Sequence, residues 1–445
     1  MRAVVFRRVV LVAILVGVIG VLAAFRQDLA NALPMQESAA ADSALAVDAP
    51  VQAQPASAMA ARSQAPHPAE ALPQANGPDA LLISVYRSLG SNDLRAALQN
   101  ADALVASYPN FQLGHLIRGD LLLMQTRPVK TLGAVQGVTD DRLENLRHEA
   151  QARIRALRER PDARMVPDAL VQLRPDQRFA FVVDARRSRL YVYENRDGYP
   201  QLVTDYYVSQ GKSGVNKLRE GDQKTPLGVY YITSRLQGPK LPDFYGSGAL
   251  PISYPNEWDR LHGRGGSGIW LHGTPSDSFS RPPLSSDGCV VLANPDLTRL
   301  SETAEIGRTP VVIADEVRFV SHAQLDRNRT LAGTLTENWR RDLEAGDGQR
   351  LRTHYSRSFR TEQGTLDNWL DRQQKWMATA RNGTLSVRDV SYFMYPGAGD
   401  LLVATFTQDA GQNGKQLLSQ RMRQYWAREG SHWRIVAETA WQQAG

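Results

Sequence analysis

The spacing of the apolar residues changes near residue 175, and this change constrains the fold more than any other feature of the sequence. Before it, Leu94, Leu98 and Ala101 fall three or four residues apart, which is the period of a helix with one buried face. After it, residues 179–184 and 189–193 are short runs of β-branched and aromatic residues on either side of a polar turn, a pattern that predicts a β hairpin. The chain of 445 residues is therefore expected to fold as several domains.

Three folded units follow from the pattern. We expect a helical domain over 79–172, a mostly β domain over 173–316 and an α+β domain over 329–445. In the first unit, helical spacing covers 94–105, 113–122 and 140–158, and the helical region as a whole is expected to extend to about residue 170. The first two of these helices, separated by Pro109 and Asn110, resemble one tetratricopeptide-like hairpin. A single copy favours a packing or homodimerisation module over a peptide-binding array.

The other two units contain strands. In the middle unit, further strands are predicted at 201–209 and 229–232, and Gly211 ends the first of them. In the last unit, three helices come before four strands. The helices are expected at 331–343, 350–359 and 366–380, and the strands at 385–395, 401–408, 415–428 and 433–441.

The N-terminus indicates export. Arg2, Arg7 and Arg8 precede an apolar run over 9–25, which is the layout of a secretory signal or of an N-terminal membrane anchor. We assign residues 1–34 to this segment and 35–78, rich in Ala, Pro, Gln and Ser, to a disordered linker. The body is therefore expected in the periplasm, with the membrane reached only through the N-terminal segment.

Composition narrows the chemistry. Lys plus Arg is 52 and Asp plus Glu is 46, a net charge of +6 without a long basic run, so no nucleic-acid partner is expected. The single cysteine, Cys289, excludes an internal disulfide and a cysteine-rich metal site. The eight histidines lack ligand-like spacing, and we expect neither a metal nor a cofactor. A lone cysteine is usually an inert buried residue, so its surroundings decide its role.

Two short segments supply those surroundings. One is the apolar run 268–271 that ends in His272 and Gly273, and the other is 285–292 around Cys289, which follows His272 by 17 positions. An imidazole beside a thiol removes its proton and stabilises the thiolate. A backbone carbonyl such as that of Gly273 can fix the tautomer of the imidazole. The small Gly288 leaves room for a substrate carbonyl, and the amides of Gly288 and Cys289 can form an oxyanion hole.

The order of these segments resembles the L,D-transpeptidase (YkuD-type) family of peptidoglycan cysteine enzymes. A third segment, 221–230, is similar to the Gly-Asp-x-x-Thr-Pro-x-Gly-x-Tyr segment of that family, and the resemblance covers about 173–316. It implies that Cys289 is the nucleophile and His272 the general base, oriented by Gly273. It further implies attack on a tetrapeptide stem, release of D-Ala and a thioester. An amine would resolve the thioester as a cross-link, and water would resolve it as trimming.

The sequence departs from the family pattern at two positions. Asp287 stands where His or Arg is usual, and Val291 stands where a basic residue is common. A carboxylate facing the sulfur would oppose thiolate formation, so we expect Asp287 to face a cation, Arg281, or the amino group of a substrate. Ser286, Asp287 and His262 are the expected substrate contacts. His262, which is also followed by a glycine, is the alternative general base, whereas Ser285 and Ser286 lack the context of a serine nucleophile.

The last unit resembles nuclear transport factor 2-like (NTF2-like) domains, in which helices precede a long-stranded sheet. Its aromatic residues are expected to fill the core, with a lined glycan or peptide pocket as the alternative. An L,D-transpeptidase-type domain followed by such a unit resembles the cell-shape L,D-carboxypeptidases. We therefore expect a peptidoglycan L,D-transpeptidase. L,D-carboxypeptidation at the same site is one alternative, and a non-catalytic cell-wall-binding scaffold is another.

Overall fold

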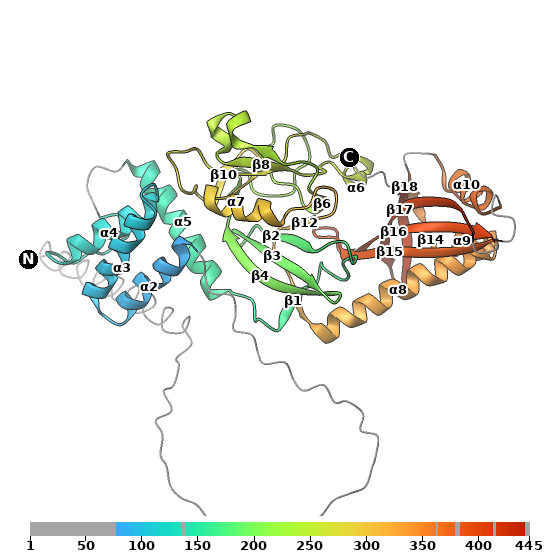
Figure 1. Ribbon diagram of the computed structural model, residues 1–445, viewed down its shortest axis with the longest axis horizontal. Helices are drawn as coiled ribbons and strands as arrows, with labels where there is room; N and C mark the ends of the chain where they lie inside the picture. The colour runs from blue at the N-terminus through green and yellow to red at the C-terminus, as the bar shows by residue number, and fades with distance from the viewer. Residues whose placement is uncertain (1–76, 135–138, 362–363, 379–382, 413–414, 441–445) are drawn as a thin grey trace, which may run out of the picture.

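A computed structural model describes residues 77–134, 139–361, 364–378, 383–412 and 415–440. Three units lie in a row: helices α2 to α5 at one end, β sheets in the middle, and a long-stranded sheet with helix α8 at the other end (Figure 1). The expected N-terminal signal or anchor, and the linker up to residue 76, lie outside the described residues. Within the described ranges, no helix combines the length and the apolar character needed to cross a membrane.

Four helices form the first unit. They are α2 (Pro78–Gly90), α3 (Leu94–Ser107), α4 (Gln112–Met124) and α5 (Asp140–Arg158). Asp93 begins α3 by accepting a hydrogen bond from the amide of Ala96 at 2.9 Å. The helices enclose a core that includes Leu82, Leu104, Phe111 and Ile117. The helices expected at 94–105, 113–122 and 140–158 are thus confirmed, whereas the likeness to a tetratricopeptide hairpin stays a prediction.

The last helix ends at Arg158 as expected, but the helical region ends before its expected limit near residue 170. Helix α5 ends at Arg158, and Pro161 and Pro167 lie in the segment that follows. Proline lacks the amide hydrogen that helix propagation needs. Residues of β1 (Met165–Pro167) instead pair antiparallel with β13 (Phe319–Ser321), so the chain enters the middle unit as a strand.

The middle unit contains two main sheets. The five-stranded sheet has the order β4-β3-β2-β12-β6, and the four-stranded sheet has the order β11-β9-β8-β7. The strands of the first are β2 (Phe179–Asp184), β3 (Arg189–Arg196), β4 (Tyr199–Tyr207), β6 (Gly228–Tyr231) and β12 (Pro310–Ala314). Those of the second are β7 (Leu236–Gln237), β8 (Gly248–Pro251), β9 (Trp270–His272) and β11 (Val290–Val291). The short β5 (Gln210–Gly211) and β10 (Leu284–Ser286) form a separate parallel pair.

The buried faces explain this arrangement. Phe181 and Val183 of the first sheet share one core with Leu271 and Val290 of the second and with Leu297 of α7 (Asn294–Thr303). The neighbouring residues of β2 point to the opposite face, where they join a second core. Strand β2 is therefore covered on both sides, as its unbroken apolar run requires. The predicted hairpin is confirmed, with Asp184 opposite Arg189.

The last unit has the expected helices-then-strands order. It consists of α8 (His322–Glu344), α9 (Gly348–Thr353), β14 (Tyr355–Arg360), α10 (Leu366–Ala378), β15 (Thr384–Met394), β16 (Leu401–Gln412), β17 (Lys415–Glu429) and β18 (His432–Ala440). The sheet order is β14-β18-β17-β16-β15, and α8 lies along it (Figure 1). The aromatic side chains of Trp339, Trp369, Phe406 and Trp426 are buried in its core.

Part of the helix expected at 350–359 is wrong. Helix α9 stops at Thr353, and Tyr355 begins β14, which pairs parallel with β18. Tyr355 lies opposite Ile435 in this pairing, and both side chains are buried. A partner strand that is distant in the sequence thus overrides the local helical spacing.

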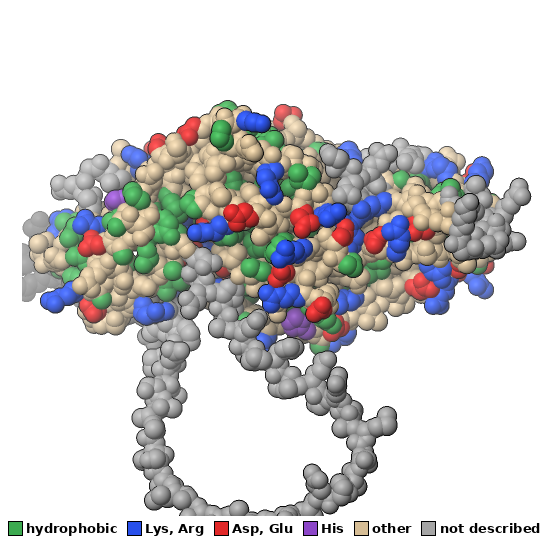
Figure 2. All heavy atoms as spheres, viewed as in Figure 1, with side chains coloured by type: hydrophobic (Ala, Val, Ile, Leu, Met, Phe, Trp, Pro, Cys, Tyr) green, Lys and Arg blue, Asp and Glu red, His purple; other side chains and the backbone are tan. Residues whose placement is uncertain are grey.

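The middle and last units share one apolar core. Phe393, Tyr395 and Tyr425 pack with Val182 and Tyr193 of the five-stranded sheet. At its edge, Glu257 of α6 (Glu257–Leu261) pairs with Arg423 of β17 at 2.8 Å. Figure 2 shows Lys and Arg side chains interspersed with Asp and Glu side chains on one face of the molecule.

Candidate active site

Strands β9 and β11 bring the two chemical segments together. They are parallel neighbours, with Val290 opposite Leu271 and Val291 opposite His272. Cys289 immediately precedes β11, so this register continues to Trp270. Since side chains alternate between the faces of a sheet, those of Cys289 and His272 belong to the same face. Cys289, just before β11, and His272, the last residue of β9, thus lie on neighbouring segments of one sheet with their side chains on the same face.

The imidazole of His272 is buried and held by the backbone. Its side chain is 1% exposed, and Nδ1 is 2.7 Å from the carbonyl oxygen of Gly273. A carbonyl only accepts hydrogen bonds, so Nδ1 carries the proton and Nε2 is left as the base. Burial lowers the pKa of His272 to about 4, although the hydrogen bond to Gly273 acts in the opposite direction. The ring is therefore neutral at pH 7 and able to accept a proton.

The thiol of Cys289 is also neutral at rest. It donates a hydrogen bond to the carbonyl oxygen of Gly268 at 3.3 Å. Burial raises the pKa of the Cys289 thiol, and the charge of Asp287 raises it further. The amide of Trp270 and the charges of Lys217 and Arg281 act against this shift. The pair therefore begins as thiol and imidazole, and the proton must move when a substrate is present.

Ser286 braces the turn before the cysteine. Its side-chain oxygen accepts a hydrogen bond from the Gly288 amide at 3.1 Å and donates one to the Cys289 carbonyl at 2.6 Å. Ser286 is only 2% exposed and is bound within the turn, and its expected contact with substrate stays a prediction. The Gly288 amide already has a partner, and an oxyanion would have to displace Ser286 from it. The oxyanion role of Gly288 and Cys289 stays a prediction.

The segment 221–230 also holds the turn before Cys289, through hydrogen bonds of Thr225. The Thr225 hydroxyl donates to the Gly288 carbonyl at 3.0 Å and accepts from the Gly211 amide at 2.9 Å. Gly288 has a φ of 126°, and a Cβ built there would lie 2.8 Å from the carbonyl oxygen of Lys224. Only glycine fits this close approach. The expectation that the segment is structural agrees with these contacts, which connect it to the nucleophile.

Asp222 organises the loop in front of Thr225. Its carboxylate accepts from the ammonium of Lys217 at 2.8 Å and from the amides of Leu218, Arg219 and Lys224. Burial acts to raise the pKa of Asp222, but these hydrogen bonds outweigh it and the pKa is lowered. Lys217 is itself 3% exposed, so this ion pair is enclosed by the loop. Sequence reasoning missed Lys217, for which the motif gives no signal.

Asp287 faces a cation, as expected, whereas His262 lies apart from the thiol. Asp287 is exposed and meets Lys212 at 3.0 Å and Gln223 at 3.2 Å, and its charge also acts on Arg281. His262 follows α6, its ring lies tilted against that of Trp258 with centroids 4.1 Å apart, and its Nδ1 donates a hydrogen bond to the Trp258 carbonyl at 2.8 Å. Among the described contacts of His262, none is with Cys289 or His272. The structure therefore gives no support to His262 as general base or substrate contact.

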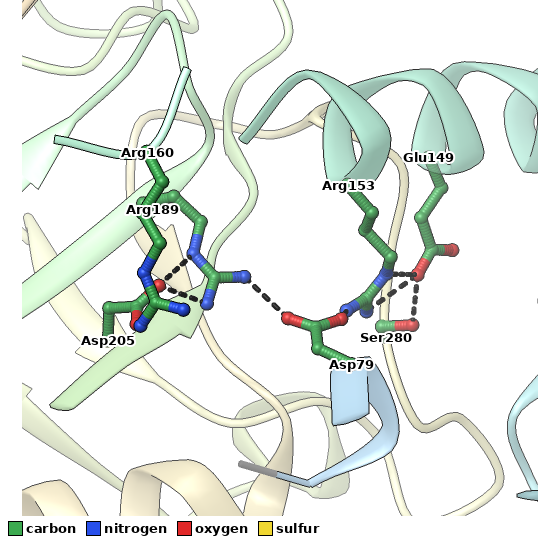
Figure 3. Close-up of polar contacts among 7 residues, drawn as sticks. All are labelled: Asp79, Glu149, Arg153, Arg160, Arg189, Asp205 and Ser280. Atoms are coloured by element: carbon green, nitrogen blue, oxygen red, sulfur yellow. Dashed lines mark hydrogen bonds and ion pairs between the residues drawn. The ribbon is translucent and has the colours of Figure 1, made fainter. Parts of the chain in front are cut away.

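The helical domain reaches the segment between His272 and Cys289. Asn110 donates to the Ser276 carbonyl at 3.1 Å, and Phe279 packs between Tyr108 and Phe111. Ser280 donates to Glu149 of α5 at 2.6 Å (Figure 3). These contacts could not be predicted from local sequence patterns, because the residues are far apart along the chain.

A buried ion cluster anchors this contact. Asp79 lies between Arg153 and Arg189, which also engage Glu149 and Asp205 (Figure 3). Arg153 and Glu149 come from α5, Asp79 from α2 and the other two from the middle unit. Every charge in it has an opposite partner, as burial demands. Neither this cluster nor any other group of three or more His, Cys, Asp or Glu side chains in the described ranges could hold a metal ion.

Two domain families match this chain. The L,D-transpeptidase catalytic domain family (YkuD) matches residues 178–313, and the Cds6 C-terminal NTF2-like domain family matches residues 332–439. The putative L,D-transpeptidase YafK of Escherichia coli (strain K12) is 30% identical over 95 residues, which are 21% of this chain and 34% of that protein. The chain thus spans about a third of the length of the curated relatives it matches.

The match to solved structures with a similar fold extends beyond the catalytic domain of this chain. The structure of Bdellovibrio bacteriovorus Bd1075 is 27% identical with a TM-score of 0.54, and the match covers 63% of this chain and 99% of that one. The helical cell shape determining protein Pgp2 from Campylobacter jejuni is 20% identical with a TM-score of 0.52, and the match covers 61% of this chain and 95% of the Pgp2 chain. The likeness to Pgp2 is one of fold.

Proposed function

We propose that this chain, which carries an L,D-transpeptidase catalytic domain followed by an NTF2-like domain, acts on peptidoglycan stem peptides through a thioester on Cys289. One observation carries the proposal. The pairing of β9 with β11 sets the lone thiol and a buried, neutral imidazole on the same face of the sheet. The Nδ1–Gly273 hydrogen bond leaves Nε2 of that imidazole as the base.

The reaction follows from these groups. Nε2 of His272 takes the proton of the thiol, and the sulfur attacks the carbonyl carbon that precedes the terminal D-Ala of a tetrapeptide stem. The C–N bond breaks, the imidazolium returns its proton to the leaving amine, and D-Ala departs with a thioester left on Cys289. An amine of a neighbouring stem then attacks the thioester. His272 accepts the proton of that amine, the new amide forms and the thiol regains its proton.

A second outcome uses the same residues. If water in place of an amine attacks the thioester, the product is a tripeptide stem and the reaction is L,D-carboxypeptidation. The joined catalytic and NTF2-like domains favour this candidate, since the same pair of domains resembles the cell-shape L,D-carboxypeptidases. The fold is shared with Pgp2, a protein described as determining helical cell shape.

The proposal also includes a periplasmic location, stem peptides as partners and a homodimer. Peptidoglycan lies outside the inner membrane, so the body is expected in the periplasm, tethered or released by the N-terminal segment. Stem peptides are the proposed partners. The exposed surface of the helical unit remains the proposed place for a homodimer.

One assay tests the chemistry. The full chain is incubated with purified tetrapeptide muropeptides, and the products are separated by chromatography and mass. Cross-linked products, or exchange of D-Ala for another D-amino acid, indicate transpeptidation, whereas tripeptide with free D-Ala indicates carboxypeptidation. Equal product from Cys289→Ala would contradict an enzymatic role and favour a non-catalytic wall-binding scaffold. His272→Ala should abolish thioester formation, and His262→Ala is the matched histidine control.

A further inference from the structure

The guanidinium of Arg281, whose charge acts on both His272 and Cys289, has no ion-pair partner among the described residues. Arg281 belongs to the segment between β9 and β10, and its guanidinium packs over the Phe244 ring at 4.6 Å from the centroid. The Phe244 ring is 5.5 Å from the ring of His272. Throughout the described ranges, no carboxylate lies within ion-pair distance of this guanidinium and no side chain accepts a hydrogen bond from it. Arg281 therefore faces the site with its donors unused.

The other cations around the site are already matched. Lys212 pairs with Asp287 at 3.0 Å, and Lys217 pairs with Asp222 at 2.8 Å. Burial lowers the pKa of Arg281, although the charges of Asp287 and Cys289 act in the opposite direction. Arginine presents a planar fork of donors that fits a carboxylate in two hydrogen bonds. An unmatched guanidinium in this position is suited to an anionic ligand.

The backbone of Arg281 is fixed before any ligand arrives. Its carbonyl oxygen accepts hydrogen bonds from the hydroxyls of Tyr207 and Ser209, both at 2.9 Å. On the preceding residues, Ser280 is bound to Glu149 and Phe279 is buried against the helical domain. Such a prepared cation binds an anion with a smaller ordering cost than a mobile side chain would.

We propose that Arg281 binds the terminal carboxylate of the donor stem peptide, an inference that rests on the proposed function. The bond to be broken lies one residue from the end of the stem. The carboxylate of the leaving D-Ala must therefore lie within about one residue length, roughly 3.5 Å, of the reacting carbonyl. The Arg281 guanidinium, which packs on the ring that lies against His272, is the cation that we place in this region. It would restrict the reaction to stems with a single residue after the scissile bond.

Binding to a protein that cannot react tests this step apart from the chemistry. Full-length Cys289→Ala protein is titrated by calorimetry with the tetrapeptide L-Ala-D-Glu-meso-diaminopimelate-D-Ala and with the same peptide amidated at its C-terminus. The free acid should bind roughly 10- to 100-fold more tightly than the amide. Adding Arg281→Gln should remove this preference by weakening only the acid, and Arg281→Lys should restore part of it.

Lys224→Gln is the control, because the contacts of Lys224 with Asp222 and with the Gly288 turn are made by its backbone, and its side chain has no described ion pair. The control should keep the full preference for the acid. The inference is overturned if Arg281→Gln keeps the preference, if it weakens both peptides equally, or if Lys224→Gln removes the preference. Release of D-Ala by the wild type together with any of these results would leave the proposed function intact. Binding of neither peptide, with no conversion by the wild type, would overturn both.

Discussion

The hydroxyl of Tyr207 donates a hydrogen bond to the backbone carbonyl of Arg281 at 2.9 Å. The ring of the same tyrosine lies under the guanidinium of Arg153, whose carbon is 4.0 Å from the ring centroid. Arg153 belongs to the ion cluster that joins α5 to the middle unit (Figure 3). One side chain therefore connects the helical domain to the segment that carries Arg281 beside His272.

The first prediction concerns this connection. Tyr207→Phe combined with Ser209→Ala removes both hydroxyls that hold the Arg281 carbonyl, and the guanidinium should lose its fixed position. We expect KM for a tetrapeptide with a free carboxylate to rise by roughly 10-fold, with a smaller change in kcat, since the loss is one of binding. The amidated peptide should be unaffected. An equal loss on both peptides would show that the hydroxyls serve stability alone.

The second prediction concerns the hydrogen bonds of Thr225. Thr225→Val removes a buried hydroxyl that holds the Gly288 carbonyl and the Gly211 amide, and leaves both without this partner. Unfolding should become easier by about 1–3 kcal/mol, and kcat should fall by roughly 10- to 100-fold as the nucleophile turn shifts. Thr225→Ser keeps the hydroxyl and should restore most of kcat. Urea titration and muropeptide turnover measure the two effects, and wild-type kcat in Thr225→Val would contradict the role.

Local sequence was sufficient for features that depend on neighbours along the chain. The hairpin of β2 and β3, and the helix over 140–158, follow from apolar spacing and a short turn. The His-Gly and Gly-Cys segments also predicted the candidate site, because the small glycines and the backbone carbonyl that the chemistry needs belong to these two short segments. The structure adds the β9–β11 register that sets them on one face.

Features that depend on distant partners could not be predicted. The strand β14 follows from pairing with β18, which local helical spacing conceals. Asp287 meets Lys212 because β5 and β10 are neighbours, and no motif relates the two residues. Ser286 looks like an available polar group in the sequence, but the turn buries it between the Gly288 amide and the Cys289 carbonyl.

The third prediction concerns pH. With the pKa of His272 at about 4 and that of Cys289 raised, the resting pair is neutral across physiological pH. Below about pH 4 the imidazole is protonated and cannot accept the thiol proton, so kcat/KM should fall there and not near 6.5, the usual value for histidine. Alkylation of the free enzyme by iodoacetamide should accelerate only at alkaline pH, where the thiolate forms.

Two measurements test whether the thiol and the imidazole are both neutral at rest. The rate of alkylation is followed by mass spectrometry across pH, and the pH dependence of kcat/KM is measured with the tetrapeptide. His262→Ala serves as the control, because an exposed histidine outside the pair should leave both profiles unchanged. A plateau of fast alkylation at neutral pH would mean that the resting state is a thiolate–imidazolium pair, contrary to the structure.

The fourth prediction concerns the contact between the catalytic and NTF2-like domains. Arg423→Leu removes the partner of Glu257, whose carboxylate is mostly buried, and should destabilise the contact by about 3–5 kcal/mol at pH 7. Burial alone would raise the pKa of Glu257, but Arg423 outweighs it and the pKa is lowered. The stability from this pair is therefore present above the unfolded pKa, near 4.5, and is lost as pH falls through the lower folded value. Glu257→Gln together with Arg423→Leu should recover part of the loss, and chemical denaturation followed by tryptophan fluorescence measures it. A loss from Arg423→Leu that stayed unchanged down to about pH 4 would exclude an unpaired Glu257 carboxylate as its source.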